Sequence, residues 1–162
     1  MNKLKFLPEL KELTSHLKKE GKRLVFTNGC FDILHLGHIR YLRAAKEEGD
    51  ILTVGLNSDS SIRTIKGCKR PIVPQDQRAE VLAALEFVDY IVIFSEPDPT
   101  LVINTLLPDV LVKGEDWSLD KIVGREVVEA NGGKVIRMPQ VKNVATTNII
   151  KTIIERYCNS NV

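Results

Sequence analysis

The sequence predicts an α/β fold in which a parallel β-sheet is covered by helices on both faces. Short apolar runs typical of buried strands alternate along the chain with longer segments of helical periodicity. These runs are apolar at successive positions, as is typical of strands that are buried on both faces. The 162 residues, 43% of them hydrophobic and 27% charged, fit one compact domain over 1–162. In such folds the ligand binds beyond the carboxyl ends of the strands.

Each element has its own signal. Within 1–21, leucines at helical spacing follow Pro8 and stop before Gly21, which predicts a leading amphipathic helix. A second helix is expected to begin around 35–38 and to end at Gly49. Further helices are expected at 75–85, 100–106, 124–130 and 147–157, and strands at 24–26, 51–56, 90–94, 110–112 and 134–136.

Composition narrows the class of protein and its partners. Lys and Arg total 23 against 21 Asp and Glu, so the net charge of +2 gives no reason to expect a nucleic-acid partner. The start of the chain does not resemble a signal peptide, and no apolar run approaches the roughly 18 residues of a membrane span, so we expect a cytoplasmic protein without a membrane segment. Cys30, Cys68 and Cys158 are widely spaced, which indicates reduced thiols.

The first candidate site is the stretch 28–38, which follows the first strand. His35 and His38 lie three residues apart at a helix start, with Gly37 between them. That spacing places both imidazoles on one face, where the helix N-terminus also favours a phosphate group. Gly37 would let a nucleotide approach closely. The alternatives are structural histidines and a metal-binding pair.

The second candidate is a basic loop at 65–71, where three cations stand beside helix-breaking residues. Lys66, Lys69 or Arg70 could close over a polyphosphate, and we expect the loop to be exposed and mobile. The alternative is an ordinary solvated loop.

Two further segments carry polar groups at predicted element ends. At 111–117 a strand runs into a charged turn with Asp116 and the single tryptophan, Trp117, which could contact ribose, base or phosphate or could simply pack on the core. At 145–148 the hydroxyls of Thr146 and Thr147 could hold a phosphate or cap the last helix.

Taken together, these motifs resemble a known superfamily. Gly29-Cys30-Phe31-Asp32 with His35-Leu36-Gly37-His38 resembles the G-x-F-D and H-x-G-H signatures of nucleotidyltransferases, which include cytidylyltransferases and phosphopantetheine adenylyltransferase. Within it the chain is similar to the D-glycero-β-D-manno-heptose 1-phosphate adenylyltransferase family. That similarity rests on Val54 to Asp59, Lys66-Gly67, Arg70-Pro71, Gln77-Arg78, Phe87-Val88-Asp89, Leu111 to Trp117 and Thr146-Thr147.

The resemblance implies a single Rossmann-like domain that transfers AMP from ATP, with Mg²⁺, to a sugar 1-phosphate and releases pyrophosphate. It assigns catalysis to His35, His38 and Lys66. It implies a nucleotide pocket lined by Thr27, Asn28, Gly29, Phe31, Lys113, Asp116, Trp117, Thr146 and Thr147. It places Asp32, Asn57, Asp59, Arg70 and Lys142 on the acceptor side, and it leaves the metal ligands unknown.

The chain departs from the family pattern at two places. Ala145 stands where a serine usually precedes the two threonines, and Gln140 followed by Lys142 stands where related cytidylyltransferases carry an arginine.

The resemblance also implies partners. It predicts a homodimer, for which the segment ending at 87–89 is one candidate interface unless it is buried in the monomer. Some relatives are fused to a sugar kinase domain, for which 162 residues leave no room, so a separate kinase is expected to supply the sugar 1-phosphate. The alternatives are a cytidylyltransferase acting on glycerol 3-phosphate, a nucleotide-binding sensor without turnover, and a metal-dependent hydrolase.

Overall fold

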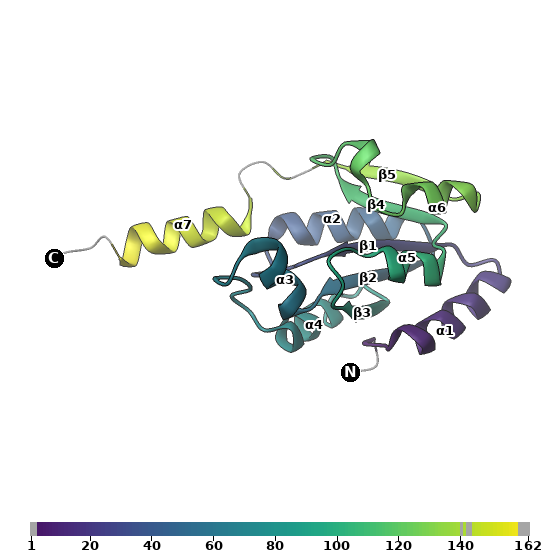
Figure 1. Ribbon diagram of the computed structural model, residues 1–162, viewed down its shortest axis with the longest axis horizontal. Coiled ribbons are helices and arrows are strands. Elements are labelled where there is room, and N and C mark those ends of the chain that lie inside the picture. The colour runs from purple at the N-terminus through teal and green to yellow at the C-terminus, as the bar shows by residue number, and fades with distance from the viewer. Residues whose placement is uncertain (1–2, 140, 142–143, 159–162) are drawn as a thin grey trace.

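A five-stranded parallel sheet forms the centre of the molecule (Figure 1). The computed structural model describes residues 3–139, 141 and 144–158. The strand order is β3-β2-β1-β4-β5, and every neighbouring pair is parallel. The strands are β1 (Leu24–Gly29), β2 (Ile51–Asn57), β3 (Tyr90–Phe94), β4 (Val110–Gly114) and β5 (Lys134–Met138). The predicted α/β class and parallel sheet are therefore confirmed.

The strand order reverses direction beside β1. The chain adds β2 and β3 on one side of β1, then returns to add β4 and β5 on the other side. Phe26 of β1 pairs with Thr53 of β2 and with Leu111 of β4. A crevice opens at such a switch point because the connections leave the two neighbouring strand ends in opposite directions.

Helices cover both faces of the sheet, as predicted. Leu42 and Ala79, from α2 and α4, belong to one buried cluster with Val54, whereas Leu10 and Ile103, from α1 and α5, belong to a second cluster on the other face. The helices are α1 (Leu7–Lys19), α2 (Leu36–Glu47), α3 (Asp59–Lys66), α4 (Gln75–Ala83), α5 (Thr100–Leu106), α6 (Arg125–Ala130) and α7 (Thr146–Tyr157), with a short 3₁₀ turn η1 (Leu119–Lys121).

The prediction of a loop at 65–71 is wrong for residues 65 and 66, because they belong to α3. The sequence analysis missed this helix. Ser58 caps it, its side chain accepting a hydrogen bond from the backbone N–H of Ser61, and Ile62 anchors it in the core. The remainder of the segment is exposed as predicted up to Lys69, whereas Arg70 is only partly exposed.

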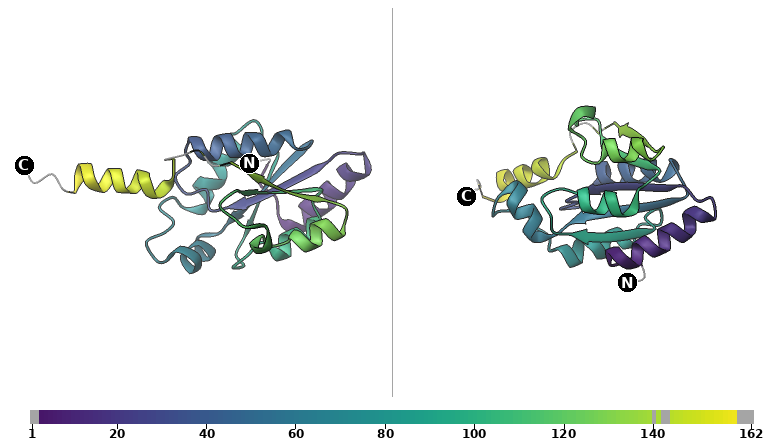
Figure 2. Two further views of the ribbon diagram at one scale, coloured as in Figure 1. Left: turned by 90° about the horizontal axis from the view of Figure 1, so that it is seen from above. Right: turned by 45° about the vertical axis from the view of Figure 1, so that its right-hand side comes forward.

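The two ends of the described chain differ in how they pack. Helix α1 lies against α5 and buries Leu10, whereas α7 extends away from the sheet and buries no residue (Figures 1 and 2). The candidate interface at 87–89 is buried within the monomer at Val88. Within the described residues no helix has both the length and the apolar character needed to cross a membrane.

Candidate active site

A cavity of about 380 Å³ lies at the carboxyl ends of β1 and β4, where the strand order reverses. Its size is in the range of small-molecule sites. The lining comes from the loop after β1, the start of α2, the end of α3, the end of β4 and the start of α7. It comprises Asn28, Gly29, Cys30, Phe31, Asp32, His35, Gly37, His38, Tyr41, Lys66, Arg70, Lys113, Gly114, Asp116, Trp117, Pro139, Val141, Val144, Ala145, Thr146 and Thr147.

The two predicted histidines form a stacked pair at the start of α2. Their ring centroids are 3.8 Å apart and their planes differ by 16°, and the ring of Phe31 packs edge-on against His38. Gly37 relieves crowding in this arrangement, because a Cβ there would lie 3.0 Å from Cε1 of His35, which would have to shift by a few tenths of an ångström. The missing side chain thus leaves room for the imidazole of His35 itself, a role that the sequence had not indicated.

Both imidazoles are kept uncharged. Burial lowers the pKa of His35. Burial also lowers the pKa of His38 to about 4, helped by the repulsion that a protonated His35 would exert on it. The Nδ1 atoms of both rings are buried without a hydrogen-bond partner among the described residues. An anion bound in the cavity would favour the protonated form of the two imidazoles through its negative charge.

The loop between β1 and α2 is strained and tightly held. Phe31 and Ile33 have φ angles of 46° and 55°, in the left-handed region that a β-branched residue such as Ile33 rarely adopts. Asp32 lies between them with a fully buried side chain that accepts hydrogen bonds from the backbone N–H groups of Ile72 and Val73 at 2.9–3.1 Å. These contacts hold the strained loop in place.

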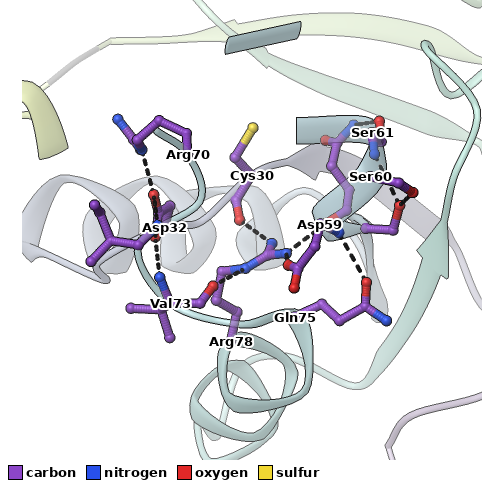
Figure 3. Close-up of polar contacts among 12 residues, drawn as sticks. Cys30, Asp32, Asp59, Ser60, Ser61, Arg70, Val73, Gln75 and Arg78 are labelled. Carbon is purple, nitrogen blue, oxygen red and sulfur yellow. Dashed lines mark hydrogen bonds and ion pairs between the residues drawn. The ribbon is translucent and has the colours of Figure 1, made fainter. Parts of the chain in front are cut away.

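Asp32 also pairs with Arg70, whose Nε lies 2.5 Å from the carboxylate (Figure 3). Burial opposes ionisation of Asp32. The two N–H donors and Arg70 outweigh it and hold the pKa of this carboxyl below its usual value. Through its contacts with Arg70, Ile72 and Val73, Asp32 joins the loop after β1 to the segment after α3.

Arg78, in the first turns of α4, connects segments that follow β1 and β2. Its side chain is 1% exposed, and its guanidinium donates to the carbonyls of Cys30 at 2.6 Å, Asn57 at 3.0 Å and Val73 at 2.9 Å. It also pairs with the carboxylate of Asp59 at 2.7 Å (Figure 3). One cation therefore holds together the ends of β1 and β2 and the segment before α4.

Sequence reasoning gave Arg78 no role beyond its place in a motif. A signal was present, since a cation near the start of a helix opposes the helix dipole and needs another reason to be there. Tyr41 was also missed. Its hydroxyl is shared with Thr27 at 2.7 Å and donates to the carbonyl of Val112 at 3.0 Å, which links β1 to β4 under the cavity.

Cations dominate the side of the cavity that follows β2. Lys66 is exposed at the last residue of α3, and Arg70 is paired with Asp32; both side chains line the cavity. Cys30 also lines the cavity, and burial raises the pKa of its thiol, although Lys66, Arg78 and Arg70 oppose that effect. Cys30 is thus held as a neutral thiol in a positively charged corner that favours anions.

The start of α7 closes the cavity on another side. Thr146 donates its hydroxyl proton to the carbonyl of Asp32 at 2.6 Å, and Thr147 and Ala145 complete the lining. Ala145 is the N-cap residue and offers no side-chain cap, so the departure from the usual serine leaves the first N–H groups of α7 without that partner.

Most of the predicted site residues meet in this cavity, and four do not line its described part. Thr27 is buried beneath it against Tyr41, Asn57 is buried and donates to the hydroxyl of Ser61, and Asp59 pairs with Arg78. Lys142, like Gln140, lies outside the described residues. The ligand contacts assigned to these four residues stay predictions.

The comparisons with known proteins agree with this geometry. Residues 26–154 match the family described as cytidylyltransferase-like. The chain is 53% identical over 155 residues to a protein of Geobacter sulfurreducens named "Bifunctional protein HldE", with 96% of this chain and 32% of that protein covered. A protein of the same name from Campylobacter fetus is 54% identical over 135 residues, which cover 83% of this chain and 29% of the relative. The chain thus spans about a third of the length of these relatives.

Two solved structures share the fold. A lipopolysaccharide core biosynthesis protein from Thermoplasma volcanium has a TM-score of 0.61 and 30% identity, over 76% of this chain and all of that one. A pantoate-beta-alanine ligase from Francisella tularensis has a TM-score of 0.62 at 18% identity, over 98% of this chain and 81% of the other, and indicates the Rossmann-like fold alone. With the family match covering most of the chain and the histidine pair at the switch point of the sheet, the chain belongs to the cytidylyltransferase-like family and is a nucleotidyltransferase.

Proposed function

We propose that the protein is an adenylyltransferase that transfers AMP from ATP to D-glycero-β-D-manno-heptose 1-phosphate, giving ADP-heptose, a precursor of lipopolysaccharide core, and pyrophosphate. The observation that carries the reaction type is the stacked, uncharged pair of His35 and His38 in a cavity lined by cations. The choice of sugar phosphate rests on the residue motifs and on the relatives named HldE.

The chemistry needs positioning and charge stabilisation more than it needs a covalent intermediate. An oxygen of the sugar phosphate attacks the α-phosphorus of ATP in line, the bond from that phosphorus to the bridging oxygen breaks, and pyrophosphate leaves. His35 and His38 donate N–H groups to the phosphates and stabilise the negative charge that develops. Lys66 and Arg70, on the β2 side of the cavity, hold the two anions close together.

The start of α7 supplies a further phosphate contact. The positive end of this helix lies at the cavity, where the N–H groups of its first turn and the hydroxyl of Thr147 can donate to a phosphate. Because the hydroxyl of Thr146 is bonded to the Asp32 carbonyl, it fixes the helix start rather than offering its proton to the nucleotide.

Mg²⁺ that enters with ATP would screen the repulsion between the reacting anions. The described residues contain no group of three or more His, Cys, Asp or Glu side chains that could hold a metal ion unaided. A cation carried by a nucleotide needs only one or two carboxylates beside phosphate and water. Asp116 lines the cavity and fits that role, whereas Asp32 is occupied by Arg70 and two backbone N–H groups.

The test is pyrophosphate release in the presence of Mg²⁺, with ATP or CTP offered against heptose 1-phosphate, glycerol 3-phosphate and phosphopantetheine. We expect release with ATP and heptose 1-phosphate alone, and loss of at least 100-fold in His38→Ala. His16→Ala, which removes an exposed histidine of α1, is the matched control and should keep full activity.

Other outcomes would revise the proposal. Release with CTP and glycerol 3-phosphate would keep the reaction type and replace the substrates. Nucleotide binding without release from any pair would favour a sensor. The homodimer, the separate sugar kinase and the cytoplasmic location stay predictions, and the dimer is tested by light scattering of the purified protein.

A further inference from the structure

The side of the cavity that follows β4 contains a buried cation for which the proposed chemistry has no use. Lys113 is 9% exposed, and its ammonium donates a hydrogen bond to Oδ1 of Asn28 on the neighbouring strand β1 at 2.5 Å. The ring of Trp117 covers the ammonium, whose Nζ is 5.6 Å from the ring centroid. Burying a lysine is costly, so its contact with Asn28 calls for a reason.

The chemistry of the pair determines how Asn28 is oriented. An ammonium group has three donors and no acceptor, so only the oxygen of the carboxamide can face Lys113. The amide nitrogen of Asn28 must then point away from Lys113. Asn28 lines the cavity and is only partly buried, and within the described residues its amide nitrogen has no hydrogen-bond partner. The pair therefore presents one oriented N–H donor to a bound ligand.

The topology identifies which part of a nucleotide would meet this donor. Lys66 and Arg70 follow β2, on one side of β1, and Lys113 and Trp117 follow β4, on the other. The phosphate-binding cations and the aromatic side chain are thus on opposite flanks of the central strand. Phosphates bound toward Lys66 and Arg70 direct the nucleoside toward Trp117, where an aromatic ring suits a base.

We propose, on the basis of the proposed function, that Lys113 is a positioning residue for base recognition. It holds the carboxamide of Asn28 so that the amide nitrogen donates a hydrogen bond to a ring nitrogen of the adenine. Asn28 contacts the substrate, and Lys113 acts through Asn28. Without the ammonium, the carboxamide is free to turn over and present its oxygen, which a ring nitrogen cannot use.

The test measures binding of ATP and of 1-deaza-, 3-deaza- and 7-deaza-ATP, each lacking one ring nitrogen, with Mg²⁺. Trp117 is the only tryptophan, so its fluorescence reports binding. We expect the wild type to lose on the order of tenfold in affinity for one of the three analogues and less than twofold for the others. In Lys113→Met all four nucleotides should bind within about twofold of one another, because the donor is no longer oriented.

Two further variants separate orientation from simple damage. Lys113→Arg keeps a cationic donor and should restore the discrimination. Asn28→Asp keeps the contact with Lys113 but removes the amide donor, so it should bind the analogues without discrimination. Lys11→Met, on the exposed face of α1, is the matched control and should behave as wild type.

The outcomes distinguish failure of this inference from failure of the proposed function. If the wild type binds ATP but does not discriminate among the analogues, or if Lys113→Met still discriminates, the inference is wrong and the proposed function stands. If the wild type binds no ATP at all, the proposed function fails and this inference fails with it.

Discussion

Acidification should destabilise this protein through His38, and the size of the effect follows from the site. The pKa of His38 is lowered to about 4 in the folded chain, whereas an unfolded histidine titrates near 6.5. Below about pH 6.5 His38 therefore binds a proton in the unfolded chain but stays neutral in the folded chain. The free energy of unfolding falls as the pH is lowered, until the pH reaches about 4. Above pH 6.5 both states are neutral at this residue and the effect disappears.

Linkage gives the magnitude. Between pH 7.5 and 5 these two pKa values correspond to a loss of about 2 kcal/mol in the free energy of unfolding. His38 is partly exposed, so solvent screening reduces the expected loss to about 1–2 kcal/mol. His38→Gln removes the titrating group and should remove this part of the pH dependence.

Urea unfolding at pH 7.5, 6.5, 5.5 and 5.0 measures the effect. Carboxyl groups also titrate in this range, so the informative quantity is the difference between wild type and His38→Gln at each pH. His16→Gln serves as the matched control, because His16 is exposed on α1. Parallel curves for wild type and His38→Gln would show that burial does not hold this imidazole neutral, and would refute the reasoning.

Four further predictions concern the same site and its support. Binding of ATP at pH 6 should be accompanied by proton uptake, because phosphate favours the charged form of a histidine. Calorimetry in two buffers of different ionisation enthalpy measures this uptake, which should disappear in His38→Gln. Asp32→Asn should slow pyrophosphate release at least about tenfold and lower the free energy of unfolding by about 1–2 kcal/mol. Unchanged activity would show that catalysis does not need the contacts of Asp32 with Arg70 and the backbone after α3. Arg78→Met should lower the free energy of unfolding by about 3 kcal/mol, since it leaves the carboxylate of Asp59 and three carbonyls without their partner. Arg125→Met, which removes a half-exposed cation of α6 paired with Glu129, is the control and should cost less than about 0.5 kcal/mol. Leu42→Ala should lower the free energy of unfolding, measured in urea, by about 2–5 kcal/mol, because it opens a cavity in the core beneath α2. A smaller loss would mean that neighbouring side chains move in to fill this cavity.

Local patterns in the sequence were sufficient for the alternation of strands and helices and for the histidine pair. The mostly apolar run 51–56 predicts a strand buried on both faces, and the structure buries all seven residues of β2, the polar Thr53 and Asn57 included. The spacing of His35 and His38 at a helix start is also local, and one helical turn suffices to bring the two rings together. The short helix α3 was missed because only Ile62 and Ile65 mark its apolar face, which is too few positions to establish a helical period.

The contacts that hold the site together were decided by the tertiary structure alone. Arg70 and Asp32 are 38 residues apart, Arg78 and Cys30 are 48 apart, and Lys113 and Asn28 are 85 apart. No periodicity relates such pairs, because each depends on the order in which parallel strands are laid beside β1. The sequence by itself determined which chemical groups follow each strand. Which of them bind a ligand and which hold another side chain in position was decided only when the sheet brought the strand ends together.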